Sequence, residues 1–154
     1  MATYDQIEKF GTPAEIINIA GTATADDAFS DTGDNAAWIN TGDAMYASLI
    51  LDAVLSAAPT AGSTIDVYAQ LFNISDGSDD ANVPDTAFPH VHVGSFPMDS
   101  GQAAQVQSIE IALPNTKTQQ LYEFYLRNNS TGQTISTGST IDVVPKVIGP
   151  EPAA

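Results

Sequence analysis

The sequence contains no cysteine, very few basic residues and no long apolar run. Without cysteine the chain can form neither a disulfide nor a thiolate metal site, and nothing in it points to secretion through an oxidising compartment. Its 4 bases stand against 19 acids, which gives a formal net charge of −15. Nucleic acids and anionic membranes bind proteins through clusters of Lys and Arg, so we expect neither as a partner. A charged partner of this chain is expected to be basic.

No stretch of the sequence is suited to crossing a membrane or to directing the chain through one. The longest apolar candidate, Ala44 to Ala58, is interrupted by Ser48, Asp52 and Ser56, whereas a transmembrane helix needs about 18 to 20 apolar residues. The first residues lack the basic and apolar regions of a signal peptide. The sequence therefore predicts a protein that is made and folded in a cytoplasm.

Apolar and polar residues alternate with a period of two in most of the chain, which is typical of strands with one buried face. The alternating segments are rich in β-branched and aromatic residues and are bounded by Gly, Pro, Asn, Asp or Ser. No helical period of 3.6 extends far enough to compete. We predict about eight strands, near Ala14–Ala20, Met45–Leu55, Thr64–Phe72, His90–Phe96, Val106–Leu113, Leu121–Asn128, a weak Gln133–Thr137, and Thr140–Ile148.

The predicted strands each have one core face and one mixed face. The clearest predicted strand has one uniformly apolar face, which consists of Met45, Ala47, Leu49, Leu51, Ala53 and Leu55. This pattern favours an all-β fold, a single antiparallel β-sandwich that is jelly-roll-like, with an immunoglobulin-like variant as the alternative. We expect one domain over residues 1–148, with residues 1–13 as an extended arm. Residues 149–154, Gly-Pro-Glu-Pro-Ala-Ala, are expected to form an extended tail that cannot pair in a sheet.

Two long acidic loops separate the predicted strands. They are Thr22–Gly42, with Asp26, Asp27, Asp31 and Asp34, and Ser75–Pro89, with Asp76, Asp79, Asp80 and Asp85. Loops of this length are usually functional or mobile. Their Asp-Gly sequences resemble calcium loops but lack the EF-hand spacing, and Asx-turn chemistry accounts for them without a metal.

The hexapeptide Gly-Ser-Thr-Ile-Asp-Val occurs twice, starting at Gly62 and at Gly138. Two copies do not make a repeat array. We interpret each copy as a turn glycine that precedes a strand whose Ile and Val face the core, and a true duplication is the alternative.

Few residues are candidates for a site. His90 and His92 are the only histidines, and on a strand they would project from the same face. A zinc site needs at least one further ligand, so two polar residues on an edge strand are the simpler interpretation. The single tryptophan, Trp38, is interpreted as a core plug at the mouth of the sandwich. The alternative is a sugar-stacking platform in which Tyr46 or Tyr68 takes part.

Catalysis has no support in the sequence. There is no Gly-x-Ser-x-Gly elbow and no phosphate-binding glycine loop. No acidic residue lies in a plainly apolar context that suits the proton donor of a glycoside hydrolase. We therefore predict no catalytic residue, no cofactor and no metal site.

Three segments carry a resemblance to a known class of protein. They are Ala37-Trp-Ile-Asn-Thr-Gly, Tyr46-Ala-Ser-Leu-Ile-Leu-Asp-Ala-Val and Pro59-Thr-Ala-Gly-Ser-Thr-Ile-Asp-Val-Tyr-Ala-Gln. A strand that begins at a tryptophan, a Pro/Gly turn and a strand with a Val-Tyr pattern follow one another. In this respect the chain, from Ala37 to Asn128, resembles small structural proteins of tailed bacteriophages, particularly head decoration or cement proteins.

The resemblance implies a β-sandwich bound to the outside of an icosahedral capsid. Such a protein clamps neighbouring subunits of the major capsid protein, often at local three-fold positions, and is expected to be a homo-oligomer, a trimer, on the capsid. A net charge of −15 agrees with an exterior location, because packaged DNA would repel the chain. A carbohydrate-binding or adhesion module of a phage head fibre or tail is the alternative.

Overall fold

The computed structural model of the chain describes residues 6–41, 44–72, 84–85, 90–113 and 121–150. In them lie nine strands, β1 (Gln6–Phe10), β2 (Ala14–Asn18), β3 (Ala37–Ile39), β4 (Tyr46–Val54), β5 (Thr64–Phe72), β6 (Val91–Pro97), β7 (Ala104–Ala112), β8 (Leu121–Asn129) and β9 (Thr140–Pro150). A short 3-10 helix, η1, spans Thr32–Asp34. Within the described ranges no helix is long and apolar enough to cross a membrane.

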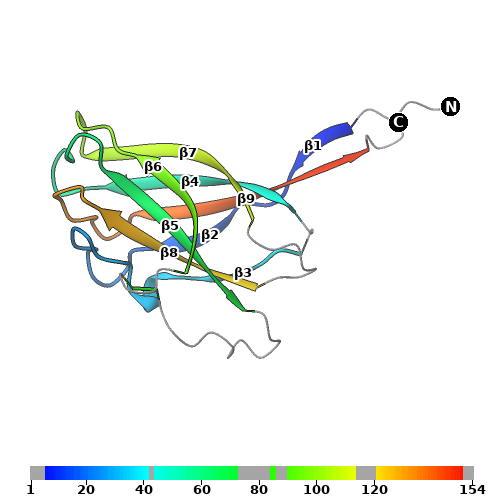
Figure 1. Cartoon of the computed structure of the whole chain (residues 1–154), viewed down its shortest axis with the longest axis horizontal. Helices are drawn as coiled ribbons and strands as arrows, with labels where there is room; N and C mark the ends of the chain where they lie inside the picture. The colour runs from blue at the N-terminus through cyan, green and yellow to red at the C-terminus, as the bar shows by residue number, and fades with distance from the viewer. Residues whose placement is uncertain (1–5, 42–43, 73–83, 86–89, 114–120, 151–154) are drawn as a thin grey trace.

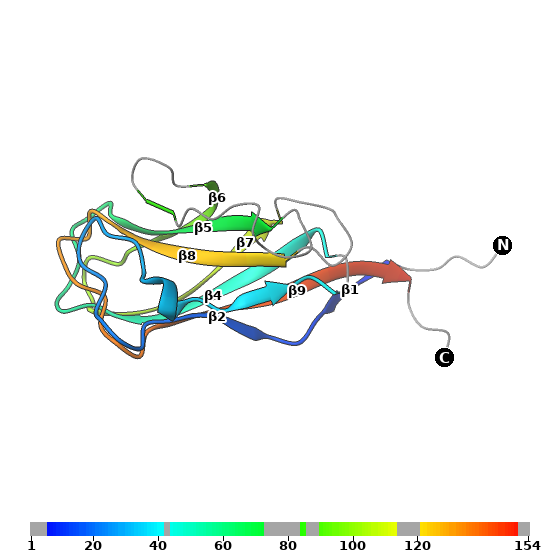
Figure 2. The same cartoon turned by 90° about the horizontal axis from the view of Figure 1, so that it is seen from below.

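The strands form two antiparallel sheets that pack face to face (Figure 1 and Figure 2). The first sheet has the order β1-β9-β4-β7, with β2 also paired to β9, and the second has the order β3-β8-β5-β6. Along the chain the pairs β2·β9, β3·β8, β4·β7 and β5·β6 are nested within one another. One long antiparallel ribbon therefore rolls up until β4 meets β9 and β5 meets β8. This arrangement is a jelly roll, so the predicted all-β sandwich is confirmed.

The core lies between the sheets and is built by alternate residues of the strands. β4 contributes Ala47, Leu49, Leu51 and Ala53, and facing strands contribute Ile65, Val67, Ala69, Tyr122, Phe124 and Leu126, all of them buried. Each large apolar side chain stabilises the fold by about 1.5–3 kcal/mol when it is fully buried. Met45 was expected on the same face, but it is exposed because β4 begins only at Tyr46.

Both copies of the repeated hexapeptide form the same turn before a strand. Gly62 and Gly138 have φ values of 82° and 85°, in the left-handed region that other L-residues avoid. β5 and β9 begin two residues later, at Thr64 and Thr140. The Ile and Val of each copy are buried in the core. The interpretation as a turn glycine before a core strand is therefore confirmed.

Strand β9 runs through the middle of the first sheet although it contains Pro145, which has no N–H to donate. One edge of β9 pairs with β4 without interruption. Along the other edge the chain is interrupted, because β1 and β2 each pair with a different half of β9. At this interruption Gly11 N donates to Pro145 O at 2.8 Å. The missing donor of Pro145 therefore points away from β4 and costs no hydrogen bond to it.

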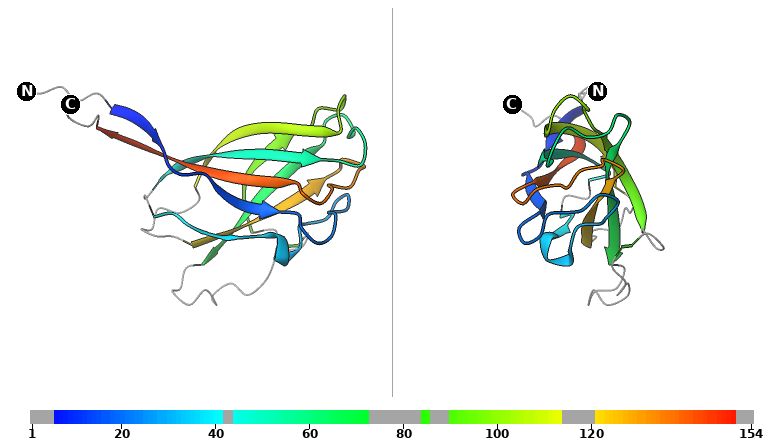
Figure 3. Two further views of the ribbon diagram at one scale, coloured as in Figure 1. Left: turned by 180° about the vertical axis from the view of Figure 1, so that it is seen from behind. Right: turned by 90° about the vertical axis from the view of Figure 1, so that its left-hand side faces the viewer.

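Beyond this interruption β1 and the end of β9 leave the sandwich as a two-stranded ribbon (Figure 1 and Figure 3). Gly11 lies at the base of this ribbon. The Cβ of any other residue there would lie only 2.5 Å from Pro145 Cγ, which is too close for two carbon atoms. The prediction that residues 149–154 cannot pair is wrong for Gly149 and Pro150, which pair with Ile7 and Gln6. For the expected arm, residues 1–13, the sequence predicts no partner strand. The described part of this arm is β1, which pairs with β9, and the link to β2.

Two further predictions differ from the structure. β3 lies inside the segment Thr22–Gly42 that was expected to be a loop. The prediction of a weak strand at Gln133–Thr137 is wrong. In this segment only Ile135 lies in β-bridges, which are isolated ones to Thr24 and Leu55. Gly132 and Gly138 flank it with positive φ, so the chain turns at both ends and only the middle residue of the segment lies in a bridge. The second acidic loop, Ser75–Pro89, lies almost wholly outside the described residues.

Replacing Gly138 by Ala is expected to lower the free energy of unfolding by about 1–2 kcal/mol, because an L-residue must adopt the left-handed conformation. An added Cβ meets no atom within 4 Å, so the cause is backbone strain and not a clash. Gly62→Ala should have a similar effect. Denaturant unfolding measures both, and Gly33→Ala is the control because its φ is not positive and its surroundings are also open. Equal stability of all three variants and the wild type would contradict this account.

Candidate functional site

The outer face of the first sheet carries most of the exposed large apolar side chains in the described part of the chain. We use "outer face" for the side of β1, β9, β4 and β7 that points away from the core. Of eight such side chains, five lie on it, namely Phe10, Tyr46, Ile50, Val54 and Val106. Val106 is the most exposed of them, at 73%. Apolar groups gathered on one face of a protein are typical of an interaction surface.

Small side chains lie between these apolar groups. The strand register sets Ala112 beside Tyr46, Ser108 beside Ile50 and Ala104 beside Val54. Ser48 stands between Tyr46 and Ile50 along β4. Because Ala and Ser project little from a sheet, a partner can approach this face closely over much of its area.

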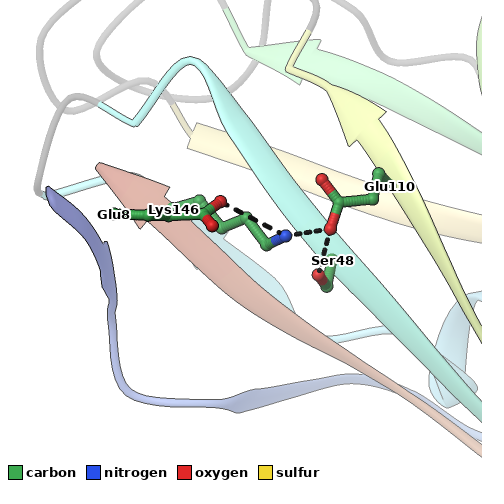
Figure 4. A network of polar contacts seen from close by, with 4 residues as sticks. All are labelled: Glu8, Ser48, Glu110 and Lys146. Carbon is green, nitrogen blue, oxygen red and sulfur yellow. Dashed lines mark hydrogen bonds and ion pairs between the residues drawn. The ribbon is translucent and has the colours of Figure 1, made fainter. Parts of the chain in front are cut away.

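A polar network crosses the outer face at the base of the ribbon (Figure 4). Lys146 Nζ on β9 lies 3.4 Å from Glu8 Oε1 on β1 and in close contact with Glu110 Oε1 on β7. Ser48 Oγ on β4 donates to the same Glu110 oxygen at 3.3 Å. The ammonium also lies 5.2 Å from the centre of the Phe10 ring. Lys146 is only 8% exposed, so one base ties together side chains from all four strands of the outer face.

Acidic groups dominate the remaining charge on the outer face. Asp142 and Glu15 are direct neighbours across β9 and β2, and Ile50 lies beside Asp142 on β4. Burial, and then the negative charge of Glu15, raise the pKa of the Asp142 carboxyl above its usual value. Asp52 adds another exposed carboxyl on β4. The outer face therefore has acidic groups among its apolar ones: Asp52 stands between Ile50 and Val54 along β4, and Asp142 lies beside Ile50.

The outer face of the second sheet differs because it is already covered. Phe29, from the first acidic loop, packs on Tyr68 with 5.4 Å between ring centres, and His92 meets Tyr68 edge-on at 5.2 Å. The Arg127 guanidinium lies over Phe29 at 5.8 Å. Tyr125 is 2% exposed, and burial, together with the charge of Glu123, raises the pKa of its phenol. Among the described side chains of this face there is no row of exposed apolar groups like that of the first sheet.

Trp38 lies on β3 and is half-buried against the core, with its ring 5.6 Å from that of Tyr122. This placement agrees with the core-plug interpretation. Beside it is a cavity of about 330 Å³, lined mainly by the link between β1 and β2, residues 38–41, Pro145 and Val147. Of the three aromatic residues considered for sugar stacking, Tyr68 is buried and Tyr46 is well exposed.

The other candidate residues have structural roles or lie apart. Asp34 Oδ1 accepts from Ala20 N at 3.0 Å, and Asp27 Oδ1 accepts from Ser130 N at 3.1 Å. His90 is not on a strand as expected: it precedes β6 with φ of 61°. Across the described ranges no group of three His, Cys, Asp or Glu side chains could hold a metal ion. Asp76, Asp79 and Asp80 lie outside the described residues.

No protein-family model, curated protein or solved structure matches the chain. Function is therefore inferred from its residues and its fold. The alternation of apolar and polar residues places Tyr46, Ile50 and Val54 on the mixed face of the strand predicted near Met45–Leu55, but nothing in the sequence marks them as a site. The additional members of the outer face, Phe10 and Val106, become visible only when the strand register is known.

Replacing Lys146 by Met keeps the aliphatic stem and removes the charge that links β1 to β7. We expect the free energy of unfolding to fall by about 1–2 kcal/mol, because two charge-assisted contacts are lost. Amide hydrogen exchange should accelerate more in β1 than in β5. The control is Lys9→Met on exposed β1, which should change stability by less than about 0.5 kcal/mol. Unchanged exchange in β1 after Lys146→Met would show that the network does not hold the ribbon.

Replacing Asp142 by Asn should stabilise the protein at neutral pH. The raised pKa means that the ionised carboxyl is disfavoured in the folded state, so its cost is absent in acid and grows as the pH rises through the carboxyl range. The variant should therefore exceed the wild type in denaturation midpoint at pH 7 and match it at acidic pH. Asp52→Asn removes one charge from the same face and is the matched control. An advantage for Asp142→Asn that persists in acid would contradict this cause.

Proposed function

We propose that this chain is a non-enzymatic structural protein of a tailed-bacteriophage virion. It decorates the outer surface of the capsid and stabilises it by bridging subunits of the major capsid protein. It is made in the cytoplasm of the bacterial host and assembles onto the particle there. The observation that carries the proposal is the exposed apolar outer face of the first sheet, which rests on a rigid jelly roll.

The outer face supports a partner of macromolecular size. Its apolar groups are distributed along strands β1, β4 and β7, and Val106 also borders a hollow of about 390 Å³ at one end of β7. Protein interfaces bury extended apolar patches of this kind, whereas small ligands occupy concave sites. The contact with a capsid shell is also broad, so the shape of the site suits it.

Charge supports the exterior of the particle. A chain of net charge −15 is repelled by packaged DNA, and in salt the repulsion is screened beyond about 8 Å. On the outside of a capsid the same charge keeps particles soluble and apart. On the outer face, Lys146 partly neutralises Glu8 and Glu110. A partner that docks on the outer face therefore does not meet two unpaired carboxylates at Glu8 and Glu110.

The fold supports a structural role or a sugar-binding role equally, because jelly rolls occur in viral capsid proteins and in lectins. The side chains favour the structural role. Sugar stacking requires an open aromatic face, and of the three aromatic residues considered only Tyr46 is well exposed, since Tyr68 is buried and Trp38 packs against Tyr122. The adhesion module is therefore the second candidate.

Purified particles of the phage that encodes the chain provide the test. The chain should be present in many copies, and particles from which it has been stripped should lose their integrity at a lower temperature. Added wild-type protein should restore the heat stability. Ile50→Gln with Val54→Gln should weaken rebinding at least tenfold, because two contact residues lose about 1.4 kcal/mol or more together.

The matched control is Ile39→Gln with Val91→Gln, which makes the same chemical changes at side chains that are similarly exposed but lie on the second sheet. This control should bind as the wild type does. Absence of the chain from purified particles would overturn the proposed function. Equal loss of binding in both double variants would place the contact somewhere other than the outer face.

A further inference from the structure

Strand β7 ends the first sheet, and its free edge can be assigned residue by residue. Leu55 N donates to Ala103 O, and Leu113 N donates to Met45 O. These bonds place the odd-numbered residues of β7 with their backbone groups toward β4. The backbone N–H and C=O groups that point away from β4 belong to Ala104, Val106, Ser108, Glu110 and Ala112. Among the described residues none of these groups has a backbone partner.

The other edges of the two sheets carry features that block the addition of a strand. β3 has only three residues. The edge formed by β1 and β2 is interrupted at Gly11–Pro13. Within β2, Ile16 O accepts a hydrogen bond from Ala36 N, so the chain near Ala36 covers part of this edge. The pairing of β5 with β6 contains a register shift, and β6 ends in Pro97. Short strands, bulges and prolines are the usual means by which proteins protect sheet edges.

Strand β7 has none of these protections. It pairs with β4 over nine consecutive residues without a register shift, and it contains no proline, lysine or arginine. Its side chains on the outer face are small or apolar except for Glu110. That carboxylate is already in contact with Lys146. A long, regular and nearly uncharged edge is the kind that pairs with another strand.

We propose that β7 pairs with β7 of a second copy of this chain, antiparallel about a twofold axis at Ser108. In this register Ala104 lies opposite Ala112 of the second copy, and Val106 lies opposite Glu110. No carboxylate therefore faces another, which is why a second copy fits this edge in spite of the acidic chain. Each of the five outward residues donates one backbone hydrogen bond and accepts one. Val106, 73% exposed in the single chain, gains the Glu110 side chain of the second copy as a neighbour on the same face.

The pairing has a consequence for the site. The twofold axis of an antiparallel strand pair is perpendicular to the sheet, so both outer faces lie on the same side of the dimer. They form one continuous surface with Ile50 and Val54 of each copy near its middle. Two adjoining docking faces suit a protein that bridges neighbouring subunits, and this consequence rests on the proposed function. The pairing itself does not. It predicts a dimer in solution, whereas the resemblance implies a trimer on the capsid.

Sedimentation equilibrium of the full chain over a range of concentrations tests the pairing, in about 0.15 M salt so that the net charge is screened. The wild type should reach twice the chain mass of 16.1 kDa. Val106→Glu places a second carboxylate opposite Glu110 of the other copy and should weaken dimerisation at least tenfold. Val54→Glu makes the same change on the interior strand β4 and should leave the dimer intact. Ser108→Pro removes an outward N–H and should also give monomers, with circular dichroism to confirm folding.

A single cysteine locates the contact, because the chain has none of its own. Ser108→Cys should be cross-linked to a dimer by a short bifunctional thiol reagent, and exposed Thr137→Cys should not. A wild type that stays monomeric at every soluble concentration would overturn the pairing, and so would a trimer or a dimer that Val106→Glu leaves unchanged. Failure to rebind particles would count against the proposed function alone, since dimerisation is measured without them.

Discussion

The shape of the molecule depends on the direction in which one missing hydrogen-bond donor points. Pro145 lies in β9, the central strand of the first sheet, where a residue without an N–H normally breaks a sheet. Because its carbonyl faces Gly11 and not β4, the ladder to β4 is complete. The opposite edge must be interrupted at the same point. That interruption separates β1 from β2 and allows β1 to leave with the end of β9 as a ribbon.

The two sheets bury their inner faces in the same way but differ on the outside. The first acidic loop places Phe29 over Tyr68 and forms a β-bridge with Arg127 of β8. This loop is therefore long enough to cover part of the outer face of the second sheet. No corresponding side chain in the described ranges covers Ile50, Val54 or Val106 on the first sheet. Burial of apolar area is the main favourable term in both folding and association. A face left uncovered within the chain is therefore available for covering by a partner.

Much of the fold could be predicted from the sequence, and much of the site could not. β4, β5 and β8 were predicted because apolar residues recur at every second position over most of each strand, although β5 and β8 also bury residues of the other face. β3 is too short to show a period, and β1 is a strand only because β9 extends to meet it. Ile50 and Val54 were visible as apolar residues on a mixed face. The contact of Lys146 with Glu110 joins residues 36 positions apart, and only the strand register brings them together.

An acidic protein can still associate if its charges are kept away from the contact. About half of the described carboxylates lie in loops or in η1, where Asp27 and Asp34 accept hydrogen bonds from backbone N–H groups and hold the turns. On β7 the single carboxylate, Glu110, is balanced by Lys146, the only base on the outer face within the described residues. Coulomb repulsion between exposed charges falls off over about 8 Å in physiological salt. A strongly acidic composition is therefore compatible with association at the edge of β7, where the one carboxylate is already paired with a base.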